Sequence, residues 1–257
     1  NTVFGEPLGV SRLEAQVNSQ DWASVWIFKA AGFVGEGCCL DGAWHEPSQR
    51  FQSLLVLACL ASDQSCDLEI PAAFSTLSRS RTRESAAVEF VALDESHLEE
   101  TLALMNDPSN MHVLCRTTEI TPEEHRRWFE GLSGREDSKY FAIMDRSHHV
   151  GNVWLRQITA EHKAAQIAIV LSRAARGRKI GQTALRFITE FAFSSGLHRI
   201  VAECRRDNPA AVNAFRGAGF LLEAIMPNHR WVGGEAVTMV RLAKVQTNQS
   251  NSIWASA

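Results

Sequence analysis

An apolar strand, a short basic loop and the start of a helix follow one another directly in the segment Ile167–Leu185. The strand ends at Leu171, and Gly181 opens a helix whose apolar residues recur with the spacing of one buried face. Such a connection brings free backbone N–H groups and the positive end of the helix dipole to one spot. The residues between strand and helix that can add charge or close approach are Arg176, Gly177, Arg178, Lys179 and Ile180. We therefore predict a phosphorylated ligand at this loop, the alternative being a solvated basic connection.

This loop resembles the pyrophosphate loop of the GNAT superfamily of acyl-CoA N-acyltransferases, whose pattern is Arg/Gln-x-x-Gly-x-Gly/Ala after a strand. Arg176, Ile180 and Gly181 fit the pattern, which differs from the Walker and dinucleotide-binding motifs. Lys179 stands where the middle glycine usually lies, and that glycine lets the backbone approach phosphate closely. The resemblance implies that acetyl-CoA is the co-substrate and that its pyrophosphate binds here.

The sequence also contains an internal repeat. A shift of 187 positions places Gly9–Glu36 on Gly196–Glu223 without a gap, and ten of the 28 aligned positions are identical. Each copy is predicted to form a strand, a helix capped by Asp21 or Asn208, an Ala-Gly-Phe sequence and a second strand. Matching caps and stop signals favour a true repeat over chance similarity between alanine-rich helices.

By resemblance, the repeated block is the second half of a GNAT domain. Residues 1–66 are then predicted to be the C-terminal half of a first copy, whose own phosphate loop would lie upstream of Asn1. Residues 67–86 are predicted to be a solvated linker, although a basic nucleic-acid arm is an alternative there. Residues 87–244 are predicted to be a complete GNAT domain, and residues 245–257 a flexible tail. Strands in 1–66 need cover, so we expect them to pack on the complete copy or to pair with another chain, as in a homodimer.

The implied fold is α/β (α+β), with a mixed central sheet flanked by helices and preceded by the partial copy. The predicted strands are Arg12–Val17, Val34–Leu40, Phe51–Leu60, Val88–Leu93, Tyr140–Met144, Val150–Leu155, Ala165–Leu171, Ile200–Cys204, Leu221–Ile225 and Ala236–Leu242. The predicted helices are Asp21–Ala31, Ser96–Met105, one that follows Thr121, one that follows Gly181, and Asn208–Ala218. Thr121, Pro122 and Glu124 form the sequence pattern of a capping box.

The resemblance assigns roles along the cofactor. The strand residues Ile169, Val170 and Leu171 would bind the pantetheine arm, and a backbone N–H near Val170 would stabilise the oxyanion of the thioester. Asn208 would contact the pantetheine, although it also fits a simple helix cap. Gln166 stands where the family often has a glutamate base, and Phe215 where it often has a tyrosine acid.

Because these two positions are altered, catalysis would depend on positioning and on a base acting through water. We name Glu203 and His125 as candidate bases. Each has a structural alternative, Glu203 as a surface carboxylate and His125 as part of a packed helix face. A non-catalytic module that binds CoA is a further possibility.

The segment Thr118–Leu132, with its Ile-Thr-x-Glu-Glu-His-x-x-Trp-Phe pattern, resembles bacterial acetyltransferases that act on 4-amino sugars of nucleotides in pseudaminic-acid-type synthesis. By that resemblance His125 and Trp128 would bind a small-molecule amine acceptor, although Trp128 also suits a core position. Ribosomal-protein N-terminal acetyltransferases share much of this pattern, so a protein N-terminus is the alternative acceptor.

Composition narrows the range of partners. The formal net charge of −3 offers no general basic surface for nucleic acid. Six cysteines show neither a metal-ligand spacing nor a CxxC pair, which favours reduced thiols, no metal and a cytoplasmic location. The longest apolar run is too short to cross a bilayer, so no membrane partner is expected.

Overall fold

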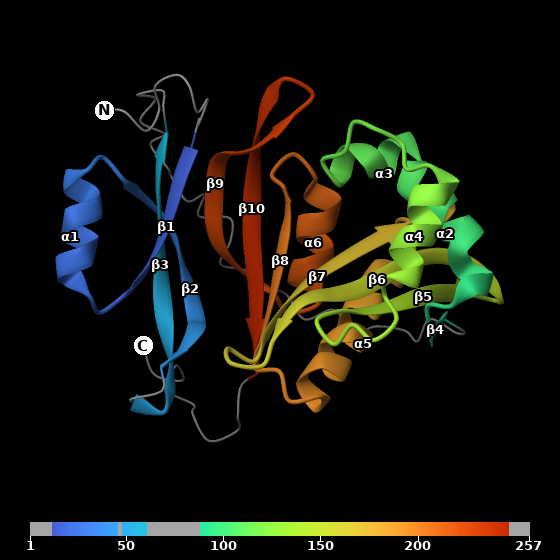
Figure 1. The fold of residues 1–257 in the computed structure, drawn as a ribbon, viewed down its shortest axis with the longest axis horizontal. Helices are drawn as coiled ribbons and strands as arrows, with labels where there is room; N and C mark the ends of the chain where they lie inside the picture. Colours follow the sequence, from blue (N-terminus) through green and yellow to red (C-terminus); the bar gives the residue numbers. More distant parts are fainter. Residues whose placement is uncertain (1–11, 46–47, 61–87, 247–257) are drawn as a thin grey trace.

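The computed structural model describes residues 12–45, 48–60 and 88–246. Ten strands form one sheet in the order β1-β3-β2-β9-β10-β8-β7-β6-β5-β4, and α1 lies at its far end (Figure 1). The strands are β1 Arg12–Asn18, β2 Val34–His45, β3 Arg50–Leu60, β4 Val88–Ala92, β5 Lys139–Asp145, β6 His148–Thr159, β7 Ala164–Leu171, β8 Arg199–Arg205, β9 Leu221–Val232 and β10 Glu235–Val245. The helices are α1 Trp22–Ala30, α2 Leu98–Asn106, α3 Pro108–Val113, α4 Pro122–Glu130, α5 Ile180–Ser194 and α6 Pro209–Gly217.

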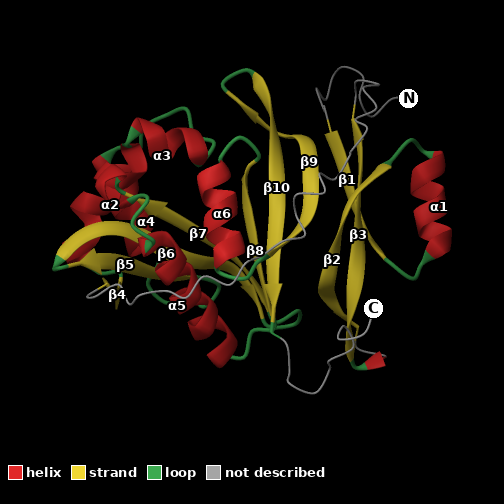
Figure 2. Ribbon diagram, turned by 180° about the vertical axis from the view of Figure 1, so that it is seen from behind, coloured by secondary structure: helices red, strands yellow, loops and turns green. Residues whose placement is uncertain are grey.

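Helices cover both faces of the β4–β10 region (Figure 2). The apolar face of α5, which includes the fully buried Ala184, Leu185 and Ile188, packs with α6 against one face of the sheet. On the opposite face, Leu104 of α2 packs against Trp154 and the β7 strand. Side chains alternate between the two faces along a strand, so successive residues of β6 and β7 pack alternately against α5 and against α2.

The predicted repeat has a counterpart in the structure. β1, α1, β2 and β3 follow one another as β8, α6, β9 and β10 do, and β3 pairs with β1 and β2 as β10 pairs with β8 and β9. A buried ion pair is repeated as well. Arg12 Nη1 donates to Glu36 Oε1 at 2.7 Å, and Arg199 Nη1 donates to Glu223 Oε1 at 2.7 Å.

The two units that share this order of elements, β1–β3 and β8–β10, meet through strands that occupy equivalent places in each. β2 pairs antiparallel with β9, and the paired residues are Gly37 and Ala224, which are themselves 187 positions apart. The contact therefore has a local twofold axis between two non-identical halves. A Cβ on Gly37 would overlap the Glu223 backbone, so the close approach requires glycine. Within the described residues, the N-terminal strands extend the sheet of the C-terminal region through the pairing of β2 with β9.

Some element boundaries differ from the predicted ones. The helix predicted at Ser96–Met105 is a 3-10 turn over Glu95–His97 followed by α2, because Asp94 caps the turn. α3 was not predicted, and it is short and capped by Asp107 with proline at its first position. β6, β9 and β10 are longer than predicted, since their ends pair as hairpins beyond the apolar runs.

Other local predictions are confirmed. Thr121 and Glu124 form the reciprocal capping box of α4. Gly32 and Gly219 adopt positive φ angles of 89° and 91° directly after α1 and α6. The predicted linker and most of the predicted tail lie outside the described residues. No helix among the described residues is long and apolar enough to cross a membrane.

Candidate active site

β7 and β8 separate at the centre of the sheet. They pair in parallel from Ala164 and Arg199 to Ile167 and Ala202, and no further pairing between them follows within the described residues. β7 continues to Leu171 and keeps its pairing with β6 on the other edge. The last residues of β7 therefore present one backbone edge to the gap between β7 and β8, which is visible in Figure 1. Ile169, Val170 and Leu171, the predicted pantetheine-binding residues, lie on this segment.

Two residues that the sequence analysis did not single out hold the end of β7. Gly151 of β6 lies so close that a Cβ there would overlap the Val170 carbonyl oxygen. The side-chain amide of Asn110 donates to the Leu104 carbonyl at 2.9 Å and to the Leu171 carbonyl at 3.3 Å. Asn110 is 2% exposed, so these bonds are made without competition from water. Neither residue belongs to a recognisable sequence motif.

In the basic loop, two cationic side chains contact the rest of the protein and a third is exposed to solvent. Arg176 Nη2 donates to Ser109 Oγ at 2.9 Å and to Asn110 Oδ1 at 2.6 Å, which ties the loop to α3. Arg178 Nη2 forms an ion pair with Asp145 Oδ2 at 2.7 Å. Lys179 is exposed and makes no ion pair among the described residues. Of the three predicted cations, only Arg178 is neutralised by a carboxylate within the described residues, and Lys179 is the one whose side chain makes no contact that would hold it away from an anion.

Lys179 also has the backbone conformation that explains the family's glycine. Its φ of 64° and ψ of 1° lie in the left-handed region, which glycine adopts without strain and other residues rarely adopt. Lys179 is the N-cap of α5 and makes no side-chain cap hydrogen bond. The first N–H groups of α5 thus lack a side-chain partner from the cap and are available to an anion at Gly181.

A cavity of about 310 Å³ lies between α2, α4 and the sheet. We call it the aromatic pocket, and its lining residues are Leu93, Thr101, Met105, Ile120, His125, Trp128, Tyr140, Asn152, Trp154 and Arg156. Its rings contact one another in series. His125 stacks on Trp128 at 5.0 Å between ring centroids, Trp128 meets Tyr140 edge-on at 5.2 Å, and Tyr140 lies 6.1 Å from Trp154.

The pocket and the end of β7 share a wall. Trp154, one of the lining residues, packs with Val170 and Leu104 in one buried cluster. Tyr140 is half-buried, and burial raises its pKa, so its hydroxyl stays protonated. An acceptor in the aromatic pocket would therefore lie next to the strand that is predicted to hold the thioester.

One ring nitrogen of His125 has no partner within the part of the chain that the structure describes. The side chain is 4% exposed, and it forms a hydrogen bond with the Leu98 backbone, whereas Nε2 is buried and finds no hydrogen-bond partner among those residues. Burial lowers the pKa of His125 below its ordinary value of 6.5. A neutral ring that bonds the Leu98 carbonyl through Nδ1–H keeps a lone pair on Nε2, and that atom belongs to a residue lining the pocket.

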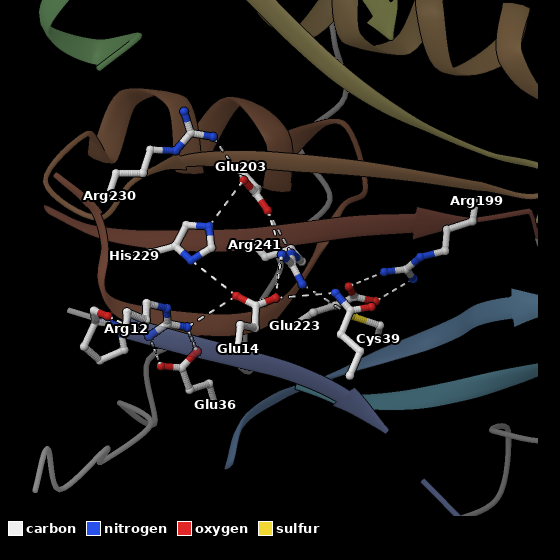
Figure 3. A network of polar contacts seen from close by, with 12 residues as sticks. Arg12, Glu14, Glu36, Cys39, Arg199, Glu203, Glu223, His229, Arg230 and Arg241 are labelled. Atoms are coloured by element: carbon white, nitrogen blue, oxygen red, sulfur yellow. Dashed lines mark hydrogen bonds and ion pairs between the residues drawn. The ribbon is translucent and has the colours of Figure 1, made fainter. Parts of the chain in front are cut away.

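Glu203, the other candidate base, lies in a polar network that joins β1 to β8, β9 and β10 (Figure 3). Its Oε1 accepts from Arg241 Nη2 at 2.8 Å and Nε at 3.0 Å, and its Oε2 lies 3.3 Å from Arg230 Nη2. Its side chain is only 10% exposed, so the alternative of a surface carboxylate is wrong. Because both oxygens are held by guanidinium groups, Glu203 is poorly placed to accept a proton from the aromatic pocket.

The remaining predicted residues have structural partners. The side chain of Asn208 caps α6 by accepting from the Ala211 N–H at 3.1 Å, as the simple-cap interpretation expects. Phe215 is 3% exposed and packs edge-on against Phe220 at 5.3 Å. Gln166 Oε1 accepts from Arg156 Nε at 2.8 Å. No group of three potential metal ligands occurs among the described residues.

Comparison with known proteins identifies the family. A family model described as an acetyltransferase (GNAT) domain matches residues 88–221, which is more than half of the chain. The chain belongs to the GNAT acetyltransferase family. The match covers the end of β7, the basic loop and the aromatic pocket, and it confirms the predicted enzyme class, an N-acetyltransferase.

Individual relatives agree with this assignment. The ribosomal-protein-serine acetyltransferase of Escherichia coli (strain K12) is 31% identical over 108 residues, which are 40% of this chain and 60% of that protein. A spermidine N-acetyltransferase from Vibrio cholerae, solved in complex with CoA and spermine, has a TM-score of 0.59 at 20% identity and covers 62% of this chain and 95% of that chain. RimL, a ribosomal L7/L12 α-N-protein acetyltransferase solved with coenzyme A, has a TM-score of 0.56 at 26% identity, with coverage of 63% and 95%. These likenesses confirm the predicted fold class.

Proposed function

We propose that this GNAT protein transfers the acetyl group of acetyl-CoA to a primary amine of a small molecule bound in the aromatic pocket. The observation that carries this proposal is a pocket that shares the Trp154 wall with β7 and is lined by His125, whose buried Nε2 has no hydrogen-bond partner among the described residues. The pocket is lined mainly by rings and apolar groups, as small-molecule sites commonly are. The chemistry of the family supplies acetyl-CoA as the co-substrate.

The cofactor would lie across the gap between β7 and β8. Its pyrophosphate would meet the N–H groups at Gly181 and the charge of Lys179, while Arg176, Gly177, Arg178 and Ile180 shape the loop. Ile169 and Leu171 would offer backbone groups to the pantetheine. Asn208, although it caps α6, stands at the helix end beside the same gap.

The reaction would be a direct transfer. The neutral amine attacks the thioester carbonyl carbon, a backbone N–H near Val170 stabilises the oxyanion, and His125 Nε2 takes the proton that the amine loses, directly or through a water. Collapse of the intermediate forms the amide and breaks the C–S bond, so CoA leaves as a thiolate that takes up a proton from the imidazolium or from solvent. Trp128 would hold the acceptor against the His125 ring.

The acceptor is the finer part of the proposal. An amino sugar nucleotide fits the Thr118–Leu132 pattern, because His125 and Trp128 of that pattern line the pocket. The relatives named for ribosomal proteins favour a second candidate, a protein N-terminus. A non-catalytic CoA-binding module remains the alternative that gives no turnover. We further propose that residues 1–66 are the C-terminal half of a first GNAT copy and that the protein acts in the cytoplasm.

The test combines binding and turnover. A Cβ at Gly181 would make only van der Waals contacts with the Leu171 and Ile169 side chains, so Gly181→Leu is expected to fold while it adds bulk at the start of α5, where the pyrophosphate is proposed to bind. We expect acetyl-CoA to stabilise the wild type against heat and to release thiol in the presence of an amine, and the variant to lose both effects. Unchanged CoA affinity in the variant would contradict the loop assignment, and CoA binding without turnover on any amine would favour the non-catalytic module.

A further inference from the structure

Two hollows on one face of the sheet meet at a single pair of side chains. Arg156 lines the aromatic pocket, and Gln166, whose Oε1 accepts from Arg156 Nε at 2.8 Å, lines a second hollow of about 220 Å³. We call the second hollow the polar cleft. Its polar lining includes Gln16, Gln157, Gln166, Arg199, Glu203 and Arg241. Because Gln16 belongs to β1, the N-terminal copy completes the cleft.

Where the two hollows meet, some charged side chains have a counter-charge and, in the part of the chain that the structure describes, one does not. Among the described residues that line the aromatic pocket, none carries a carboxylate, and Arg156 is the one charged member. In the polar cleft, the Glu203 carboxylate is matched by Arg241 at 2.8 Å, and Arg199 is matched by Glu223. Arg156 forms no ion pair within the described part of the chain. Its positive charge is therefore the uncompensated one where the two hollows meet.

The geometry leaves the guanidinium available. Gln166 occupies the Nε–H of Arg156, which fixes the plane of the group, and Arg156 is exposed at the mouth of the pocket. The two terminal nitrogens can then face a carboxylate or phosphate oxygen in the paired arrangement that arginine favours. A polyamine would meet the opposite situation, because its second ammonium would approach Arg156 and find no carboxylate in the pocket lining.

We propose that Arg156, oriented by Gln166, is an anion subsite that selects primary amines carrying a carboxylate or phosphate group over neutral amines and polyamines. The inference rests on the proposed function, because it assumes that the aromatic pocket holds the acceptor. The amine would lie near His125, the body of the acceptor between the rings, and the anionic group at the junction with the polar cleft.

A matched acceptor series tests the proposal. Benzylamine, 4-(aminomethyl)benzoate and 4-(aminomethyl)phenyl phosphate share one amine and one ring but differ in the anionic group, and spermidine supplies the polyamine. We expect kcat/KM of the wild type to be higher for the two anionic amines than for benzylamine or spermidine. Arg156→Gln should lower kcat/KM for the anionic amines by about tenfold to a hundredfold through KM, with a much smaller change for benzylamine. Arg126→Gln is the matched control, since Arg126 is exposed on α4 and pairs with Glu95 outside the pocket.

The possible outcomes distinguish failure of the anion subsite from failure of the proposed acetyl transfer. Equal losses for benzylamine and the anionic amines in Arg156→Gln, or a preference for spermidine, would overturn the anion subsite while acetyl transfer stands. Acetylation of peptide N-termini alone would overturn it as well. If no amine is acetylated, a change in tryptophan fluorescence on adding the benzoate in the presence of CoA still reports binding, because Trp128 and Trp154 line the pocket. Binding weakened by Arg156→Gln would support the subsite, and equal binding would overturn it.

Discussion

Replacing Lys179 with glycine is expected to stabilise the protein, although the change removes a side chain. The left-handed backbone at Lys179, with φ of 64°, costs a residue that has a Cβ roughly 1–2 kcal/mol. Glycine removes this cost but gives the unfolded chain more freedom, which takes back roughly 0.4–1 kcal/mol. The exposed lysine side chain makes no ion pair among the described residues, so its loss contributes little. The net gain in the free energy of unfolding is then about 0.5–1 kcal/mol.

Urea and thermal unfolding of the CoA-free protein measure this gain, because bound ligand would add its own stabilisation. For a chain of this size we expect the Tm to rise by about 1–4 °C. Lys179→Ala is the control, since alanine loses the same charge but keeps the Cβ and therefore the strain. A gain in Lys179→Ala equal to that in Lys179→Gly, or a loss in Lys179→Gly, would refute the assignment of backbone strain to this position.

Three further predictions concern the site and the contact between the copies. His125→Gln should lower kcat by about 10²- to 10⁴-fold with acetyl-CoA affinity retained. Because burial lowers the pKa of His125, the wild-type rate should persist on the acid side below pH 6.5. A kcat that the substitution leaves unchanged would show that His125 takes no part in proton transfer. Gly151→Ala should displace the end of β7 beside Val170 and lower turnover, measured as thiol release, by up to about 100-fold. Full activity of the variant would show that the strand tolerates the overlap. His229 and Arg241 lower the pKa of Glu14 from 4.5 to about 2, so its stabilising effect is complete above pH 4.5 and is lost as the pH falls towards 2. In urea titrations, the free energy of unfolding should therefore fall more steeply with decreasing pH for the wild type than for Glu14→Gln. Parallel pH dependences of the two proteins would argue against this role of Glu14.

Local signals predicted the elements of the fold well. Caps such as Thr121 and helix-ending glycines such as Gly32 act over a few residues, so the sequence alone shows where α4 begins and where α1 ends. α3 has a cap at Asp107 and a proline at its first position, but its six residues carry too little periodicity to show that a helix follows the cap. The pairing of Gly37 with Ala224 joins positions far apart in the chain, and no local pattern reports the register of such a contact.

The candidate site was predicted unevenly for the same reason. The loop could be predicted because its residues are contiguous, whereas the inward bonds of Arg176 to α3 depend on a helix 66 residues away. His125 and Trp128 could be named because both belong to the contiguous pattern of Thr118–Leu132, whose resemblance to known acetyltransferases marked them. Tyr140 and Trp154 complete the pocket from separate strands, and the guanidinium groups that occupy Glu203 come from β9 and β10. These partners become neighbours only when the sheet is assembled.

The central claim is that acetyl-CoA held at the loop acylates an amine held in the aromatic pocket. The most direct measurement follows thiol release from acetyl-CoA with 4-(aminomethyl)benzoate and, in the same reaction, the acetylated amine by mass spectrometry. Our account predicts one acetylated amine for each thiol released in the wild type, and loss of both signals in Gly181→Leu. Saturable CoA binding with no acetylated amine, or thiol release without acetylated amine, would contradict it.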